Sequence, residues 1–263
     1  GLGFGTPPPH AVLSGMFCKS VPESETIIAS AILSHFESYS RLNGLPIPRN
    51  WNDIYSPSGP TVLTTLAEFD PYRHERKPAD YFGTWCVETG AAPQWPSLAG
   101  VRTIAYLKAD PQLIDRCASL SQAGLNTLLV CDGKAPVGIK ELPNLTLSQQ
   151  LLATEMKSDR YGLIVCNGNH GLTMRAIELG VPVAMFPLYI EQRWNASVVE
   201  ELGLGINLSR HSAGCWSQLI SSLTAPSDFD RSRIEYSVDF CKRNQNSCER
   251  AIAALLEWSN SYK

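Results

Sequence analysis

A loop rich in glycine and asparagine follows a short apolar run in the second half of the chain, where residues Tyr161 to Cys166 read YGLIVC. A helical pattern begins directly after this loop, which covers Asn167 to Gly171. Such a loop leaves backbone N–H groups unpaired at the positive end of a helix, which favours the binding of a phosphate. We therefore expect a phosphate to be held by Asn167, Gly168, Asn169, His170 and Gly171.

The residues after the loop continue as a helix, a strand and a second helix. Gly180 follows the first helical pattern where a C-cap is expected, and Pro182 stands just beyond it. A second apolar run covers Val181 to Phe186, and another helical pattern extends from near Glu191 to Gly203. Strands and helices that alternate in this order are typical of a parallel sheet with helices on its faces.

The same alternation begins upstream, from Val101 onward. Asp110 and Pro111 suit the N-cap and first position of a helix that ends near Ala123. No hairpin signal interrupts the alternation, so we predict an α/β fold with a doubly wound, Rossmann-like parallel sheet. The expected strands cover 101–107, 125–131, 142–147, 161–166 and 181–186, and the expected helices 111–123, 148–156, 216–223 and 234–258, the last one broken near 244–247.

Composition excludes several classes of protein. The 263 residues carry a formal net charge of -3, whereas a nucleic-acid-binding protein usually shows a basic stripe. No apolar run approaches the ~20 residues of a membrane helix, and no signal sequence is visible. The 8 cysteines form no CxxC pair and several lie in apolar segments, which is typical of a reducing compartment. We expect a cytoplasmic protein with no metal site, no transmembrane segment and no nucleic-acid partner.

The second half of the chain resembles the nucleotide-sugar motif of the GT-B glycosyltransferases, the enzymes that glycosylate plant metabolites, macrolides and sterols. The resemblance rests on Gly168, Gly180-Val181-Pro182, Pro187, Glu191-Gln192 and Asn195-Ala196. The chain departs from the motif at four positions. Asn167 stands in place of the phosphate-binding histidine, Asn169 replaces a glycine, Leu172 replaces a hydroxyl residue, and Arg175 replaces the acidic residue that holds the ribose.

The resemblance implies a metal-independent, inverting hexosyltransferase without a resident cofactor. Its donor substrate would be a nucleotide diphosphate sugar, a UDP- or dTDP-sugar, and its acceptor a small molecule. Glu191 and Gln192 would then hydrogen-bond the sugar hydroxyls, although a helix N-terminus favours Glu191 without any ligand. Lys108 ends a strand near the expected phosphate and is equally typical of an ordinary surface lysine. Ser148, Gln149 and Gln150 lie where such enzymes contact the base, and a capping role suits them as well.

The resemblance also implies a domain organisation. Residues 1–85 would be a remnant of the acceptor domain with its linker, residues 86–235 the donor-binding domain, and residues 236–263 helices that cross back toward the N-terminal part. Residues Ser24 to Leu42 form an amphipathic helical pattern, in which His35 is expected to be packed, and a strand is expected within Thr61 to Phe69.

The general base of the transfer is not identified in this chain. The resembled enzymes take a catalytic histidine from the first loop of the acceptor domain, and no residue here matches it. His10, His35 and His170 remain alternatives. We therefore expect the chain to be mainly the donor-binding half and to be inactive alone, with a missing N-terminal half or a second chain supplying the rest.

Two other functions compete with this hypothesis. A non-catalytic module that binds a nucleotide sugar or a protein partner is favoured by the asparagines of the loop, which stand where the motif has a histidine and a glycine. A GT-B sugar epimerase also uses a glycine-rich donor loop. If Asn167 occupies the phosphate position, Asn167→His is expected to strengthen diphosphate binding by about 1 kcal/mol, because a protonated imidazole forms a charge-assisted bond.

Overall fold

The computed structural model of the chain describes residues 22–44, 47, 62–71, 73, 81–85, 90–95, 98–148, 162–225 and 229–261. The chain divides into two compact units. The Rossmann unit is Thr84–Gln245, and the split unit combines Gly1–Gly83 with Asn246–Lys263. His10, Gln149 and Gln150, and nearly all of the helix expected over 148–156, lie outside the described residues.

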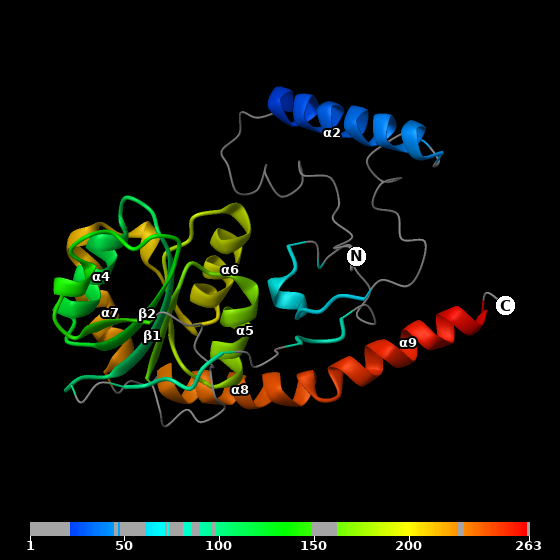
Figure 1. Cartoon of the computed structure of the whole chain (residues 1–263). Helices are drawn as coiled ribbons and strands as arrows, with labels where there is room; N and C mark the ends of the chain where they lie inside the picture. The colour runs from blue at the N-terminus through cyan, green and yellow to red at the C-terminus, as the bar shows by residue number, and fades with distance from the viewer. Residues whose placement is uncertain are drawn as a thin grey trace. The chain divides into compact units, whose positions relative to one another are not determined.

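The Rossmann unit is built on a six-stranded parallel sheet, which confirms the fold class (Figure 1). The strand order is β3-β2-β1-β4-β5-β6, the order of a dinucleotide-binding Rossmann sheet. The expectation missed β6, because its three residues include a glycine and show no apolar run. The strands are β1 Arg102–Lys108, β2 Asn126–Asp132, β3 Leu145–Ser148, β4 Leu163–Cys166, β5 Val183–Met185 and β6 Gly205–Asn207.

Helices cover both faces of this sheet. Figure 1 shows α4 and α7 beside one face and α5 and α6 beside the other, and α8 packs against α5. Neighbouring residues of the central strands, such as Ile104 and Ala105, are both fully buried, as a parallel sheet with two covered faces requires. The helices are α4 Leu113–Gln122, α5 His170–Glu178, α6 Ile190–Glu201, α7 Trp216–Thr224 and α8 Phe229–Asn244.

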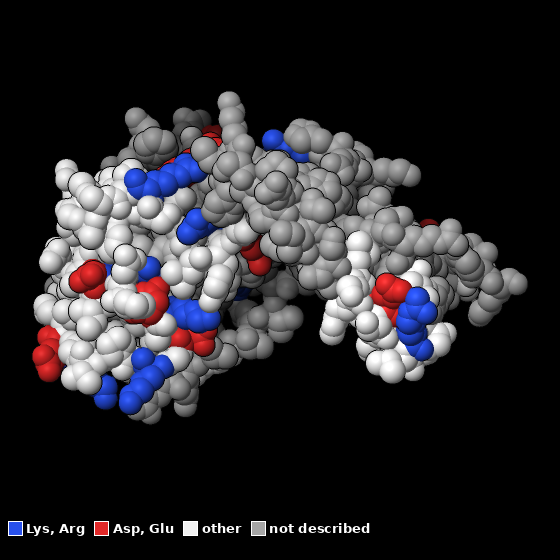
Figure 2. All heavy atoms as spheres, turned by 90° about the horizontal axis from the view of Figure 1, so that it is seen from above, with Lys and Arg blue, Asp and Glu red and all other residues white. Residues whose placement is uncertain are grey.

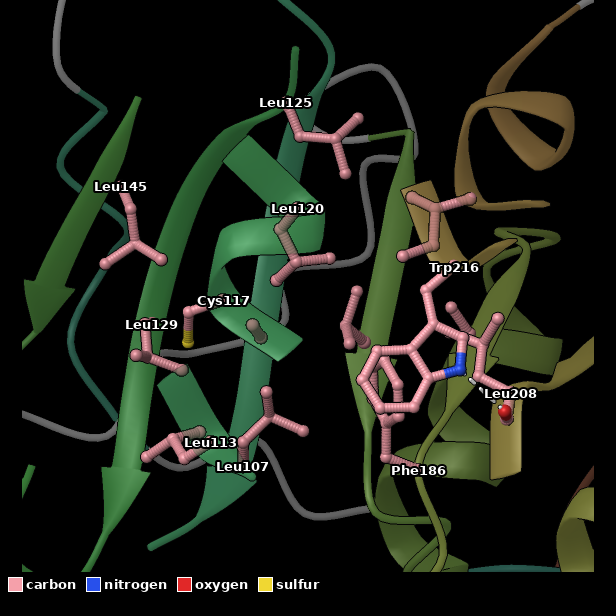
Figure 3. Close-up of a cluster of buried hydrophobic side chains, with 14 of the residues drawn as sticks. Leu107, Leu113, Cys117, Leu120, Leu125, Leu129, Leu145, Phe186, Leu208 and Trp216 are labelled. Atoms are coloured by element: carbon pink, nitrogen blue, oxygen red, sulfur yellow. Dashed lines mark hydrogen bonds between the residues drawn. The ribbon is translucent and has the colours of Figure 1, made fainter. Parts of the chain in front are cut away.

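The core on the α4 and α7 face consists of leucines, other aliphatic residues and one aromatic pair (Figure 3). The rings of Phe186 and Trp216 meet edge to face at a centroid distance of 4.9 Å. The Trp216 indole N–H donates to the backbone oxygen of Leu208 at 2.9 Å, so the buried ring leaves no polar atom unpaired. A pair of this kind contributes about 0.5–1.5 kcal/mol beyond its buried area, and it fixes the start of α7 against the end of β5.

Helix ends follow the sequence signals closely. Gly180 has a φ of 64°, and its N–H donates to Ile177 O while Val181 N–H donates to Ala176 O. These two bonds form a Schellman motif, which confirms the C-cap expected there. The N-cap expected at Asp110 is displaced, because α4 begins at Leu113 after Gln112. Asp110 still accepts the Gln112 N–H at 2.8 Å and pairs with Arg116 at 2.7 Å.

The split unit contains helices α2 Pro22–Asn43 and α9 Ser247–Ser261 and the short 3-10 helix η1 Ala67–Phe69. The strand expected within Thr61 to Phe69 is wrong, because Leu63 forms only a single bridge with Tyr81 before η1 begins. The expected packing of His35 is also wrong. His35 and Tyr39 are exposed on α2, because a helical apolar pattern does not by itself provide a surface that covers it.

Asn246, in the left-handed region at a φ of 53°, separates α8 from α9, as the expected break near 244–247 anticipated. Arg250 of α9 donates to Phe82 O at 3.1 Å. Residues from both ends of the sequence are thereby joined within the split unit. None of the helices in the described part of the chain is long and apolar enough to cross a membrane.

Candidate functional site

The candidate site lies at the carboxyl ends of three adjacent strands, β1, β4 and β5. In this strand order the chain reverses its winding between β1 and β4, and ligands of open α/β sheets bind in the crevice outside that point. Lys108 ends β1, Asn167 follows β4, and Phe186 follows β5. The residues of the predicted phosphate loop therefore lie at the topological switch point.

Asn167 is buried and connects the three strands. Its Oδ1 accepts the Lys108 backbone N–H at 2.8 Å, and its Nδ2 donates to the Phe186 backbone oxygen at 2.8 Å. The backbone N–H of Phe186 in turn donates to Cys166 O at 2.9 Å. The side chain that the sequence placed among the phosphate ligands thus bonds to the backbones of both neighbouring strands.

Gly168 is held against α6 so closely that only a glycine fits. Its φ is 89°, and a Cβ there would lie 2.8 Å from the backbone oxygen of Gln192. Its own carbonyl accepts from Asn195 Nδ2 at 2.9 Å, and its N–H donates to Cys166 Sγ at 3.3 Å. Asn195, one of the motif residues, is buried, and this bond joins α6 to the loop.

The thiol beneath this loop is not a nucleophile. Cys166 is completely buried, and burial raises its pKa to about 12. A thiol with such a pKa stays protonated at neutral pH and has little reactivity. Cys166 therefore serves as a packed residue and a weak hydrogen-bond acceptor.

Helix α5 presents its N-terminus beside the loop. Asn169 is exposed at the N-cap, and its side chain makes no capping bond to the helix. A Cβ placed on Gly171 would have no atom within 4 Å, so the space beside this residue is open. His170 is half-buried, and burial lowers its pKa, so the imidazole is neutral near pH 7. The first turn thus offers backbone donors and neutral side chains.

The segment after β5 and the first turn of α6 place a second set of polar side chains at the carboxyl edge of the sheet. Gln192 Oε1 accepts the backbone N–H groups of Leu188 at 2.9 Å and Tyr189 at 3.3 Å, which caps α6. Within the described residues no protein group accepts from the Gln192 amide nitrogen. Glu191 is exposed in the first turn of the same helix. Gln192 can therefore cap the helix and donate to a ligand at the same time.

Lys108 reaches the start of α6. Its Nζ donates to the Tyr189 hydroxyl at 2.8 Å and lies 5.2 Å from the centroid of the Tyr189 ring. This hydrogen bond, together with the nearby Asp132 carboxylate, raises the pKa of Lys108. The ammonium group stays charged throughout the neutral range, while the side chain remains exposed.

Arg175 occupies the position at which the motif carries an acidic residue. Its side chain is buried and forms an ion pair with Glu178 at 2.6 Å. The Glu178 backbone oxygen accepts from Ser237 of α8 at 2.9 Å. A carboxylate that could accept from ribose hydroxyl groups is therefore absent at position 175.

The remaining predicted residues are only partly placed. Ser148 ends β3, and its expected neighbours Gln149 and Gln150 are outside the described range. Within the described ranges, no three His, Cys, Asp or Glu side chains gather as metal ligands. On the face of the Rossmann unit turned to the viewer in Figure 2, positive and negative side chains stand next to each other. This face therefore shows no extended positive field of the kind that steers anions.

Comparisons with known proteins give one consistent result. No family model matches the chain. Over 104 residues, 38% of its length, the chain is 32% identical to UDP-glycosyltransferase 71B6 of Arabidopsis thaliana, and the match covers 22% of that protein. Over 103 residues it is 28% identical to NDP-glycosyltransferase YjiC of Bacillus subtilis strain 168, where the match covers 26% of the relative.

A solved structure shares the fold over a longer stretch. The glycotransferase of kitacinnamycin superposes with a TM-score of 0.64 at 15% identity, over 85% of this chain and 61% of that one. The chain therefore spans about a quarter of the length of the two curated relatives and 61% of this structure.

Proposed function

We propose that this chain, which is similar over part of its length to the GT-B nucleotide-sugar glycosyltransferases, binds the donor of a sugar transfer. The donor is a nucleotide diphosphate sugar, a UDP- or dTDP-sugar, and the acceptor is a small molecule. The diphosphate lies over residues 167–171, and the transfer inverts the configuration at the anomeric carbon of the sugar without a metal ion.

One observation carries this proposal. The first turn of α5 is open in front of Gly171 and lies at the switch point of the sheet. Backbone N–H groups and the positive end of a helix are suited to phosphate oxygens. Gly168 brings the loop against α6, so that Glu191 and Gln192 stand beside the same edge. A donor whose diphosphate meets α5 would place its sugar toward these two side chains.

We assign the two units different parts of the reaction. The Rossmann unit binds the donor, and the split unit supplies part of an acceptor domain. General-base catalysis contributes typically ~10²–10⁴-fold, and no residue of this chain matches the catalytic histidine of the resembled enzymes. We therefore expect this chain alone to hydrolyse the donor slowly at most and to form no glycoside over several turnovers.

Calorimetric titration with UDP and dTDP tests donor binding. The informative variant is Gly171→Leu, because a side chain there enters open space and needs no rearrangement of the fold. We expect binding of the unmodified chain in the micromolar to millimolar range, and a loss of about tenfold or more in the variant, since its side chain covers the backbone donors. Absence of heat at millimolar UDP and dTDP would rule out a donor site at this loop.

A second candidate function is a non-catalytic nucleotide-sugar-binding or protein-interaction module. The observation that favours it is Asn167, whose amide is bonded to the backbones of β1 and β5 in place of a charged phosphate ligand. Incubation with nucleotide sugars and phenolic, sterol and sugar acceptors, with and without an added acceptor half, separates the two functions. Product that forms only with the added half supports the transferase, and donor binding without any product supports the module.

A further inference from the structure

The contact between Lys108 and Tyr189 crosses the predicted phosphate loop. Lys108 ends β1 and Tyr189 follows β5, and β4 lies between these two strands in the sheet. Two strand spacings separate β1 from β5, about 9–10 Å, so the side chains must extend over the end of β4 to meet. The residues that follow β4 are those of the loop itself. The ammonium group and the phenol ring therefore meet across the end of β4, where the loop begins.

The backbone of each partner of this contact is held by a hydrogen bond to a side chain of the site. The backbone N–H of Lys108 donates to Asn167 Oδ1 at 2.8 Å, which ties the end of β1 to the loop. The backbone N–H of Tyr189 donates to Gln192 Oε1 at 3.3 Å, which ties the phenol to the first turn of α6. The backbone of Lys108 and the tyrosine that its ammonium group contacts are thus both held in place, although the lysine side chain is exposed.

The described side chains of the loop and of α5 provide no unpaired positive charge for a diphosphate. Asn167 is neutral and engaged with backbone groups. His170 is neutral near pH 7 because burial lowers its pKa. Arg175 is positive but is paired with Glu178. A diphosphate over this loop would meet neutral or paired side chains from β4 and α5, so a cation from another element would add a charge-assisted bond.

We propose that Lys108, positioned by Tyr189, is the cationic ligand of the diphosphate over this loop. The inference rests on the proposed donor function and names the residue that replaces the missing charge. An ammonium group has three N–H donors. One is used by the Tyr189 hydroxyl, and the other two are directed to non-bridging phosphate oxygens. Tyr189 is a positioning residue, because it acts on the phosphate through Lys108.

Calorimetry with two probes, UDP and inorganic pyrophosphate, tests the proposal at low salt. Lys108→Gln keeps the length of the side chain and removes its charge, and we expect both probes to bind about tenfold more weakly, as for the loss of a charge-assisted bond. Lys108→Arg is expected to retain most of the affinity. The matched control is Lys242→Gln, which removes one positive charge from the exposed end of α8 and is expected to leave both affinities unchanged.

Tyr189→Phe tests the positioning role. This variant keeps the ring and loses the hydroxyl, so a purely structural contribution of the aromatic side chain is preserved. We expect the pKa of Lys108, followed by nuclear magnetic resonance of labelled lysine, to fall, because the hydrogen bond that raises it is lost. Pyrophosphate affinity is expected to fall severalfold, and an unchanged pKa with unchanged affinity would remove Tyr189 from the proposal.

The outcomes separate this inference from the function on which it rests. Normal UDP and pyrophosphate binding by Lys108→Gln overturns the inference and leaves donor binding intact. Tighter binding by Lys108→Gln also overturns it, because the lysine would then obstruct the loop. Pyrophosphate binding that depends on Lys108, without preference for UDP, supports the inference and rejects the nucleotide. Binding of neither probe by the unmodified chain overturns both.

Discussion

The candidate site has two layers whose polar groups are used in opposite ways. We call Asn167, Gly168 and Asn195 the floor and Lys108, Tyr189, Glu191 and Gln192 the rim. The floor residues are buried, and their polar atoms bond to the backbones of Lys108 and Phe186, to the Cys166 sulfur or to each other. The rim is largely exposed, and its side chains have donors or charges that backbone groups do not use.

This difference separates stability from binding. A buried polar group that loses its partner costs roughly 1–3 kcal/mol, whereas an exposed substitution usually changes stability by less than about 0.5 kcal/mol. Floor substitutions should therefore unfold the protein more easily, and rim substitutions should change ligand affinity in a protein that still folds. The predictions below test this separation.

Gly168→Ala should have the largest effect. A residue other than glycine is strained at a φ of 89°, and its Cβ would lie 2.8 Å from Gln192 O, a backbone atom that moves only with α6. We expect the free energy of unfolding, measured by urea denaturation, to fall by about 3 kcal/mol. Gly171→Ala is the matched control, because its Cβ enters open space in the first turn of α5. A similar loss in both variants would contradict the assignment of Gly168 to the floor.

Asn167→His distinguishes the two roles assigned to this residue. As a floor residue, Asn167 bonds to Lys108 N and Phe186 O, and an imidazole cannot occupy its buried place with the same two bonds. We expect a loss of about 2 kcal/mol in unfolding free energy, with no gain in UDP affinity measured by calorimetry. A gain of about 1 kcal/mol in diphosphate binding with unchanged stability would instead return Asn167 to the phosphate position.

Gln192→Ala should have an intermediate effect, since this side chain serves both layers. It removes the acceptor of the Leu188 and Tyr189 N–H groups, and loss of such a cap costs about 1 kcal/mol. Glu191→Ala is the neighbouring control and is expected to change stability by less than about 0.5 kcal/mol. Thermal denaturation separates the two, and if both residues bind the sugar, both variants should weaken binding of a UDP-sugar more than binding of UDP.

The smallest expected effect is the pH dependence from His170. Its pKa is lowered by burial, so below the ordinary value near 6.5 the unfolded chain binds a proton that the folded chain does not. The free energy of unfolding should thus decrease as the pH falls through the folded-state pKa. Urea denaturation at about pH 7.5 and about pH 5 should show a smaller decrease in His170→Gln than in the unmodified chain. Equal decreases would mean that His170 is not responsible.

Much of the fold could be predicted because the signals are local. Apolar runs bounded by glycine and proline located five of the six strands to within a few residues, and Gly180 marked the end of α5 by the φ that its cap requires. β6 was missed because three residues carry too little pattern. The strand expected near Leu63 failed because β-forming residues become a strand only where a partner of several residues is available.

The sequence predicted where the residues of the candidate site lie in the fold better than it predicted what their side chains bond to. The motif located the loop and the start of α6, since both depend on the order of elements along the chain. It did not reveal that Asn167 bonds to Lys108 or that Tyr189 contacts Lys108. The first pair is 59 positions apart in the sequence and the second pair 81, so no local pattern records either contact. The exposed Tyr189 carried no signal in the sequence, whereas the sequence did show that Asn167 stands where the motif has a histidine.

The division of the chain has a consequence for the order of events during synthesis. The Rossmann unit is one uninterrupted stretch, Thr84–Gln245, whereas the split unit needs α9 from beyond it. Domains generally fold as units while the chain emerges from the ribosome. The sheet can thus close as soon as residue 245 has emerged, while the earlier segment waits for α9, even though it was made first. A helix that is synthesised after the Rossmann unit thus completes a unit whose first segment precedes it.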